Sequence, residues 1–171
     1  MDNNVYFEKN GYVFNYRVGA VIKKGDKILV QEHKQVDYYS LLGGRCEMGE
    51  DSISAILREL KEESGLDGTV TKPIAIIENF FVSPYNGKDY HEMFFAHEVE
   101  FNDKSIYNKE EIETIEEDKK DYVKYVWKSI DEISKCDFRP KVLLDIIKKD
   151  EFTHYINVDE SAKTLKREIN Q

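Results

Sequence analysis

The sequence has little that could cross-link a chain. Only two cysteines, Cys46 and Cys136, occur among its 171 residues. They form neither a CxxC pair nor a disulfide framework, which is typical of a protein from a reducing compartment. The chain is the size of one ordinary domain, and that length is enough to bury a core without disulfide or metal staples.

Positive charge is outnumbered by negative charge. The chain has 25 Lys and Arg residues against 34 Asp and Glu residues, a net charge of −9 at pH 7. Binding to DNA or RNA depends on clustered basic side chains, so we expect no specific nucleic-acid binding. A polyanionic substrate would need a cation to help it approach so acidic a surface.

Long apolar runs are missing as well. A typical maximum is Val18–Ile22, far below the roughly 20 residues needed to cross a membrane. The polar, acidic start of the chain does not resemble a secretory signal. We therefore expect a soluble cytoplasmic protein with no membrane association. Hydrophobic residues make up 40% of the chain, the composition of a folded domain rather than a disordered one.

Strand signals dominate the first third of the sequence. Val5–Glu8 and Tyr12–Ile22 are β-rich runs on either side of Asn10-Gly11, a strong hairpin turn signal. A third run, Lys27–His33, follows. The stretch Tyr38–Leu42 then leads into a double glycine and an irregular segment.

One amphipathic helix follows this segment. From Ser52, apolar residues recur with the i, i+3, i+4, i+7 spacing of a single helical stripe. Asp51 is well placed as its N-cap, and Gly65 is a natural C-terminal stop.

The remainder alternates between strand and helix signals. Strands are predicted at Pro73–Val82, Tyr90–Val99 and Tyr122–Trp127, helices at Ser129–Lys135 and Pro140–Lys149, and an extra strand within Phe152–Val158. This order predicts an α/β protein, a sandwich with a mixed β-sheet. We expect one domain over residues 1–150. Residues 151–171 would be a charged extension packed on that domain or trailing from it.

Three carboxylates lie on one face of the predicted amphipathic helix. Glu59 is three residues before Glu62 and four before Glu63, so the three repel one another by roughly 0.2–0.5 kcal/mol per pair. The last two also lie in the final turn, where the helix dipole disfavours negative charge. A divalent cation would turn this repulsion into coordination, and carboxylate oxygens suit Mg²⁺ or Mn²⁺. A solvated acidic surface is the alternative reading of the same residues.

The surrounding residues form a recognisable motif. From Gly44 to Leu66 the chain reads GRCEMGEDSISAILRELKEESGL. This segment resembles the Nudix box, G-x5-E-x7-R-E-U-x-E-E-x-G-U with U aliphatic, at every specified position. One departure precedes the box, since Leu41-Leu42-Gly43-Gly44 replaces the frequent Leu-Pro-Gly-Gly. The resemblance implies a Nudix-like α/β/α sandwich along most of the chain.

The resemblance also implies a function and roles for residues. A Nudix hydrolase uses a divalent cation, Mg²⁺ or Mn²⁺, to hydrolyse the pyrophosphate bond of a nucleoside diphosphate linked to another group. The implied metal ligands are Glu59, Glu62 and Glu63, with the Gly43 carbonyl. Glu59 or Glu62 would also act as the base. Arg58 would hold the carboxylates in place, and Glu50 would support that arrangement.

A further acidic ligand is expected from a loop late in the fold. The acidic segment Glu110–Asp118 and its neighbours supply four candidates: Glu113, Glu116, Glu117 and Asp121. Spacing to Trp127 favours Asp121, and side-chain reach favours Glu117. A simple solvated charge run is the alternative.

Two other residues are candidates for binding substrate. Arg17 lies in an otherwise apolar strand and so needs a partner, either substrate phosphate or ribose or a structural salt bridge. Tyr85 belongs to an aromatic cluster beside the predicted cleft and could stack on a base. Trp127 is expected in the core. Cys46, with acids nearby, is not expected to act as a nucleophile.

The substrate itself stays open at this point. The proline of the ADP-ribose subgroup has no match at the right spacing, because Pro73 is too early and Pro84 is late. Nucleoside triphosphates, ADP-ribose and nucleotide sugars all fit as small-molecule partners, and a homodimer is plausible. The alternative function is a nucleotide sensor that binds on the same fold without turnover.

Overall fold

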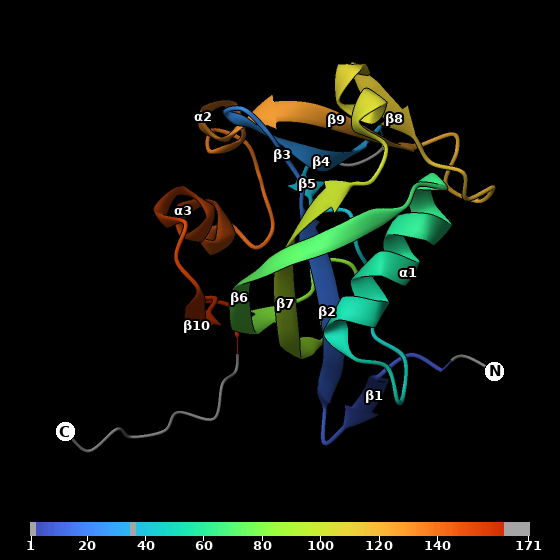
Figure 1. Ribbon diagram of the computed structural model, residues 1–171. Coiled ribbons are helices and arrows are strands. Elements are labelled where there is room, and N and C mark those ends of the chain that lie inside the picture. The colour runs from blue at the N-terminus through green and yellow to red at the C-terminus, as the bar shows by residue number, and fades with distance from the viewer. Residues whose placement is uncertain (1–2, 35–36, 163–171) are drawn as a thin grey trace.

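Two five-stranded sheets form the frame of the protein (Figure 1). The computed structural model describes residues 3–34 and 37–162. Helix α1 lies on one side of the sheets and helices α2 and α3 lie on the other. This arrangement confirms the predicted α/β sandwich.

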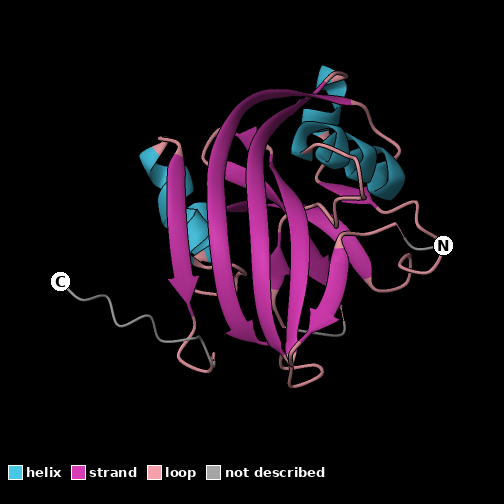
Figure 2. Cartoon of the chain, turned by 90° about the horizontal axis from the view of Figure 1, so that it is seen from below, coloured by secondary structure: helices cyan, strands magenta, loops and turns pink. Residues whose placement is uncertain are grey.

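The larger sheet is mixed, as predicted. Its order is β1-β2-β7-β6-β10. The pairs β2–β7 and β6–β10 are parallel, whereas β1–β2 and β6–β7 are antiparallel. Figure 2 shows its long strands side by side. The strands are β1 (Tyr6–Lys9), β2 (Tyr12–Val21), β6 (Gly68–Val82), β7 (Asp89–Phe101) and β10 (Thr153–Val158).

A second sheet is antiparallel and packs across the first. Its order is β3-β4-β9-β8, and β5 pairs with β4 at one end. The strands are β3 (Lys23–Lys24), β4 (Lys27–His33), β5 (Tyr39–Ser40), β8 (Glu111–Glu113) and β9 (Val123–Ser129). The sequence predicted β4 and β9 but neither β3 nor β8, and it did not predict a second, separate sheet.

Each group of helices covers its own apolar cluster. Helix α1 (Ser52–Ser64) contributes Ala55, Ile56 and Leu60 to the core on its side. On the other side, α3 (Val142–Lys149) buries Leu143 and Ile147, next to the one-turn helix α2 (Ile130–Ile133). The sheets are thus buried from both sides, which fixes the position of α1.

Some boundaries differ from those predicted. Strand β6 begins at Gly68, five residues earlier than expected, because irregular pairing on either side of Pro73 lets the strand continue through it. Helix α3 begins at Val142 rather than Pro140. Neither the 3-10 helix η1 (Lys104–Asn108) nor β8 was predicted, and β8 lies in the acidic segment because Ile112 is buried opposite Tyr125.

The predicted extra strand near the C-terminus is confirmed. Thr153–Val158 forms β10 and pairs with β6 from Ala75 to Phe80, so this part of the chain belongs to the mixed sheet. Residues 163–171 of the predicted extension lie outside the described residues. None of the helices in the described ranges is both long and apolar enough to cross a membrane.

Candidate active site

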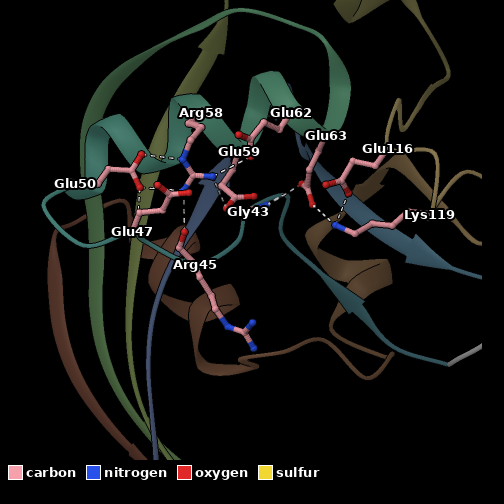
Figure 3. Close-up of polar contacts among 10 residues, drawn as sticks. All are labelled: Gly43, Arg45, Glu47, Glu50, Arg58, Glu59, Glu62, Glu63, Glu116 and Lys119. Atoms are coloured by element: carbon pink, nitrogen blue, oxygen red, sulfur yellow. Dashed lines mark hydrogen bonds and ion pairs between the residues drawn. The ribbon is translucent and has the colours of Figure 1, made fainter. Parts of the chain in front are cut away.

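Helix α1 begins and ends where the sequence predicted. The Asp51 side chain accepts hydrogen bonds from the amides of Ile53 and Ser54, which caps the N-terminus. Gly65, with φ of 72°, ends the helix in the left-handed region. These two caps set the ends of the helix. Its acidic face points toward the Gly43–Gly44 segment (Figure 3).

Arg58 is the centre of a network of carboxylates. Its Nε and Nη2 donate to the two oxygens of Glu50, both at 2.9 Å. Its Nη1 donates to Glu59 at 3.0 Å and to Glu62 at 2.9 Å, and Nη2 also reaches the carbonyl oxygen of Arg45. One guanidinium therefore holds three glutamates and one loop carbonyl in a fixed arrangement (Figure 3).

The acids of this network differ in their electrostatics. The hydrogen bonds from Arg58 hold the pKa of Glu50 below its usual range and raise the pKa of Arg58 itself. Burial raises the pKa of Glu59, although Arg58 opposes that shift. Glu62 is the exposed member, with 52% of its side chain accessible.

Glu63 is the most buried of the helix carboxylates. Its side chain is 2% exposed and accepts a hydrogen bond from the Gly43 amide at 3.3 Å. The Lys119 ammonium lies 3.3 Å from the other oxygen of Glu63 and also contacts Glu116. Burial raises the pKa of Glu63 despite this cation. The hydroxyl of Tyr125 is buried beside Glu63, and burial together with that carboxylate raises the pKa of Tyr125.

The double glycine allows this close approach. A Cβ atom on Gly44 would lie 2.3 Å from the carboxylate of Glu59. Gly43 has φ of 151°, and a Cβ there would lie 2.1 Å from the carbonyl oxygen of Val18. Gly43 therefore requires glycine, whereas a side chain at Gly44 would push the flexible end of Glu59 aside.

The structure places the four late acidic candidates differently. Of the four candidates, Glu116 comes close to the helix carboxylates, through Lys119, which it shares with Glu63. Glu117 is 86% exposed and pairs with Lys120 instead. Asp121 and Glu113 are also exposed. Reach and spacing favoured Glu117 and Asp121, whereas the structure brings Glu116 toward Glu63.

A cavity of about 320 Å³ separates the glutamates from a group of basic residues. Its lining residues are Asn4, Arg17, Gly43, Gly44, Arg45, Glu59, Glu63 and Lys119. A larger cavity of about 810 Å³ adjoins it, with Arg17 lining both. Tyr85, 65% exposed, lines the larger cavity with Tyr38, and their rings are 6.4 Å apart.

Arg17 has no structural salt bridge within the part of the chain that the structure describes. None of the ion pairs there includes it, and its buried Nε lacks a hydrogen-bond partner. The salt-bridge alternative is therefore not what the structure shows. The guanidinium is placed between the two cavities and lacks an acidic partner, which favours an anionic ligand.

Sequence reasoning missed two basic residues of the site. Arg45 lies within the motif at a position the motif leaves unspecified, and Lys119 lies in a segment that reads as acidic. The prediction that Trp127 lies in the core is confirmed, because it is buried and donates to the carbonyl of Lys109. Burial raises the pKa of Cys46 to about 11, which disfavours the thiolate.

The donor chemistry of the site fits a hard divalent cation. Glu59 and Glu63 line one cavity and offer carboxylate oxygens, the ligands that Mg²⁺ and Mn²⁺ prefer. The Lys119 ammonium between Glu63 and Glu116 marks a place where positive charge is stable. As they stand, no three acidic, histidine or cysteine side chains among the described residues converge on one point. Glu59 and Glu62 are turned to Arg58 instead.

Comparisons with known proteins agree with this geometry. Residues 13–147 match the family model of the NUDIX domain. YjhB of Bacillus subtilis (strain 168), provisionally named an ADP-ribose pyrophosphatase, is 34% identical over 79 residues, 46% of this chain. The aligned part of the chain spans only 38% of the length of YjhB.

Solved structures show the same fold. A NUDIX hydrolase from Nitrosomonas europaea superposes with a TM-score of 0.60 at 16% identity, over 85% of this chain and 79% of that one. The E. coli ORF135 protein superposes with a TM-score of 0.56 at 22% identity, over 80% and 89% of the two chains. Because the family model covers most of the chain, and the motif lies on the helix that carries the clustered glutamates, the chain belongs to the Nudix hydrolase family.

Proposed function

We propose that this protein hydrolyses the pyrophosphate bond of a nucleoside diphosphate linked to another group, in a reaction that depends on Mg²⁺ or Mn²⁺. One observation carries the proposal. The cavity next to α1 has Glu59 and Glu63 on one wall and opens at Arg17 toward a second cavity large enough for a nucleoside or sugar. Nudix hydrolases generally use divalent metal ions and act on small nucleotide derivatives.

The helix carboxylates would hold the cation. Glu59, Glu62 and Glu63 supply oxygen ligands, together with the carbonyl of Gly43. A bound divalent cation neutralises the phosphates, polarises the phosphorus and lowers the pKa of a coordinated water. Without a metal, Glu59 and Glu62 accept hydrogen bonds from Arg58. Glu116, which shares Lys119 with Glu63, would be the late acid that joins these ligands.

The protein's own groups account for the other roles. Arg58 and Glu50 position the carboxylates, because Arg58 contacts three of them at once. We assign the general base to Glu59 rather than Glu62. Glu59 lines the cavity, whereas Glu62 is 52% exposed and is not among the lining residues. Arg17 would hold a phosphate, and Tyr85 would stack on the group in the larger cavity.

ADP-ribose is the first substrate to test, because YjhB bears that provisional name. Nucleoside triphosphates and nucleotide sugars follow. The protein would act in the cytoplasm, which agrees with the two free cysteines of the described residues. It would act as a monomer or a homodimer.

A substrate panel with Mg²⁺, Mn²⁺ or EDTA tests the proposal. We expect cleavage of one substrate class that EDTA abolishes, with products resolved by chromatography. Glu59→Gln should lower turnover at least 100-fold, since it removes both a ligand and the base. No turnover of any substrate, with nucleotide still bound, would overturn the proposal in favour of a sensor.

A paired measurement tests the late ligand. Glu116→Gln should weaken Mg²⁺ binding about tenfold by calorimetry, because it removes a carboxylate beside the site. Glu117→Gln removes the same charge from an exposed position and should change the affinity by less than twofold. Equal effects of the two variants would contradict the placement of Glu116.

A further inference from the structure

We propose that Arg45 is a second phosphate-binding residue, which grips the substrate's diphosphate together with Arg17, and that a buried Asn15–Glu92 pair positions it. The inference deepens the proposed function and rests on it. We call Arg17 and Arg45 the arginine wall, and Glu59 and Glu63 the glutamate wall. The two walls line the same cavity.

The first argument is how the arginines are paired. Four arginines belong to the described part of the chain. Arg58 contacts three carboxylates and Arg139 pairs with Asp137. Among the ion pairs of residues 3–34 and 37–162, none includes Arg17 or Arg45. In a protein with nine more acidic than basic residues, two arginines without an acidic partner in one cavity indicate a site for an external anion.

The second argument is the relative position of the two arginines. Arg17 on β2 and Arg45 in the loop before α1 are opposite each other in an antiparallel bridge. Paired residues in such a bridge have side chains on the same face, so both guanidiniums lie on one side of the sheet. Figure 3 shows the Arg45 guanidinium turned away from α1 and from the glutamates.

The third argument is that Arg45 is held in place by buried groups. Its Nε donates to Oδ1 of Asn15 at 3.1 Å. The Asn15 amide in turn donates to Glu92 at 3.1 Å, and the other Glu92 oxygen accepts from Asn79. Asn15 and Glu92 are 4% and 6% exposed. Because the Asn15 nitrogen is bonded to Glu92, its oxygen must face Arg45, which fixes the guanidinium before any ligand binds.

The Arg45 guanidinium keeps its outer edge free for a ligand. Its Cζ lies over the ring of Tyr6, 4.4 Å from the centroid, a cation–π contact that leaves its Nη donors available. These donors form no hydrogen bond in the described part of the chain, whereas Nε is bonded to Asn15. A planar fork of this kind matches two phosphate oxygens.

The two walls together define the ligand. Arg17 lines both cavities, so it is placed to bind the phosphate joined to the group in the larger one. Arg45 lines only the smaller cavity and would bind the next phosphate. Two adjacent phosphates, with arginines on one side and a cation held by glutamates on the other, fit the charge of the cavity. A single phosphate would leave one arginine without a partner.

Calorimetry with methylenediphosphonate, which cannot be hydrolysed, tests the inference at saturating Mg²⁺. We expect Arg45→Ala to weaken binding at least tenfold and Arg45→Lys to restore part of the loss. Asn15→Ala should weaken binding three- to tenfold through loss of positioning. The control is Arg139→Ala, which removes the same charge from an arginine of the larger cavity that Asp137 already pairs, and it should change affinity less than twofold.

The outcomes are distinguishable from those of the proposed function. An Arg45→Ala variant that binds within twofold of the parent, with an unchanged melting curve, overturns the inference. Binding that depends on Arg45 without turnover of any nucleotide would overturn the proposed hydrolysis and leave the diphosphate site standing. For an active substrate, Asn15→Ala should raise KM and leave kcat unchanged, whereas partial unfolding would lower kcat.

Discussion

The two walls of the small cavity are built in opposite ways. Glu59 and Glu63 of the glutamate wall both lie on α1, and each has a cationic partner, Arg58 for Glu59 and Lys119 for Glu63. The arginine wall comes from β2 and the loop before α1, and its two guanidiniums have no carboxylate partner in the described residues. The charges of the glutamate wall are paired within the fold, and those of the arginine wall are not.

This difference separates stability from binding. A charge that is paired inside the fold contributes to stability, and removing its partner leaves a desolvated ion behind. A charge held by Asn15 and Tyr6 is oriented but not neutralised, so it retains its affinity for an anion. We therefore expect mutations on the two sides to act on different measurable quantities.

The largest effect is expected from Arg58→Met compared with Arg45→Met. Loss of Arg58 leaves Glu50 and Glu59 without their cation, and their side chains are only 16% and 13% exposed. The free energy of unfolding should fall by about 3 kcal/mol. Arg45→Met leaves no carboxylate behind and should cost about 1 kcal/mol or less. Urea unfolding of the metal-free proteins at pH 7 measures both.

Equal losses for the two variants would contradict the contrast. If Arg45→Met were as destabilising as Arg58→Met, the arginine wall would be a structural element like the Arg58 network. Its lack of an acidic partner would then carry no information about a ligand.

A smaller and more local effect is expected from Gly44→Ala. Its Cβ would displace the flexible carboxylate of Glu59, so turnover should fall at least tenfold with little change in stability. The matched control is Gly49→Ala, because Gly49 has φ of 83° and its Cβ would meet nothing within 4 Å. That variant should lose about 1 kcal/mol of stability and keep its turnover per folded molecule. Loss of turnover in both variants would contradict the direct contact between Gly44 and Glu59.

The same contrast explains what the sequence could predict. The caps of α1, the row of glutamates and their link to Arg58 are set by positions a few residues apart, and a linear pattern contains that information. Most strands were found for the same reason. The family resemblance, carried by the motif, identified the metal-binding carboxylates and the sandwich fold.

The parts that could not be predicted depend on contacts between distant segments. Arg45 faces Arg17 only because a loop crosses β2, 28 residues apart in sequence. Glu116 rather than Glu117 turns inward because Lys119 binds both Glu116 and Glu63. Which of several neighbouring acidic side chains points inward is decided by a tertiary contact, and charge spacing in the sequence does not encode that contact.

The smallest effect concerns pH and compares two glutamates with opposite shifts. Arg58 lowers the pKa of Glu50, so its contribution to stability is complete above the unfolded value near 4.3 and is lost as pH falls. Burial raises the pKa of Glu63 above its unfolded value. Between these two pKa values the native state binds more protons than the unfolded state, so acidification stabilises the native state.

In EDTA, Glu63→Gln should therefore lose more stability than the parent on going from pH 7 to pH 5. Over the same range Glu50→Gln should follow the parent, as should the exposed Glu117→Gln, because the contribution of Glu50 is lost only below about pH 4.3. Parallel urea-unfolding profiles for Glu63→Gln and the parent would mean that Lys119 fully offsets the burial of Glu63. Lys119 would then neutralise Glu63 as well as Arg58 neutralises Glu59.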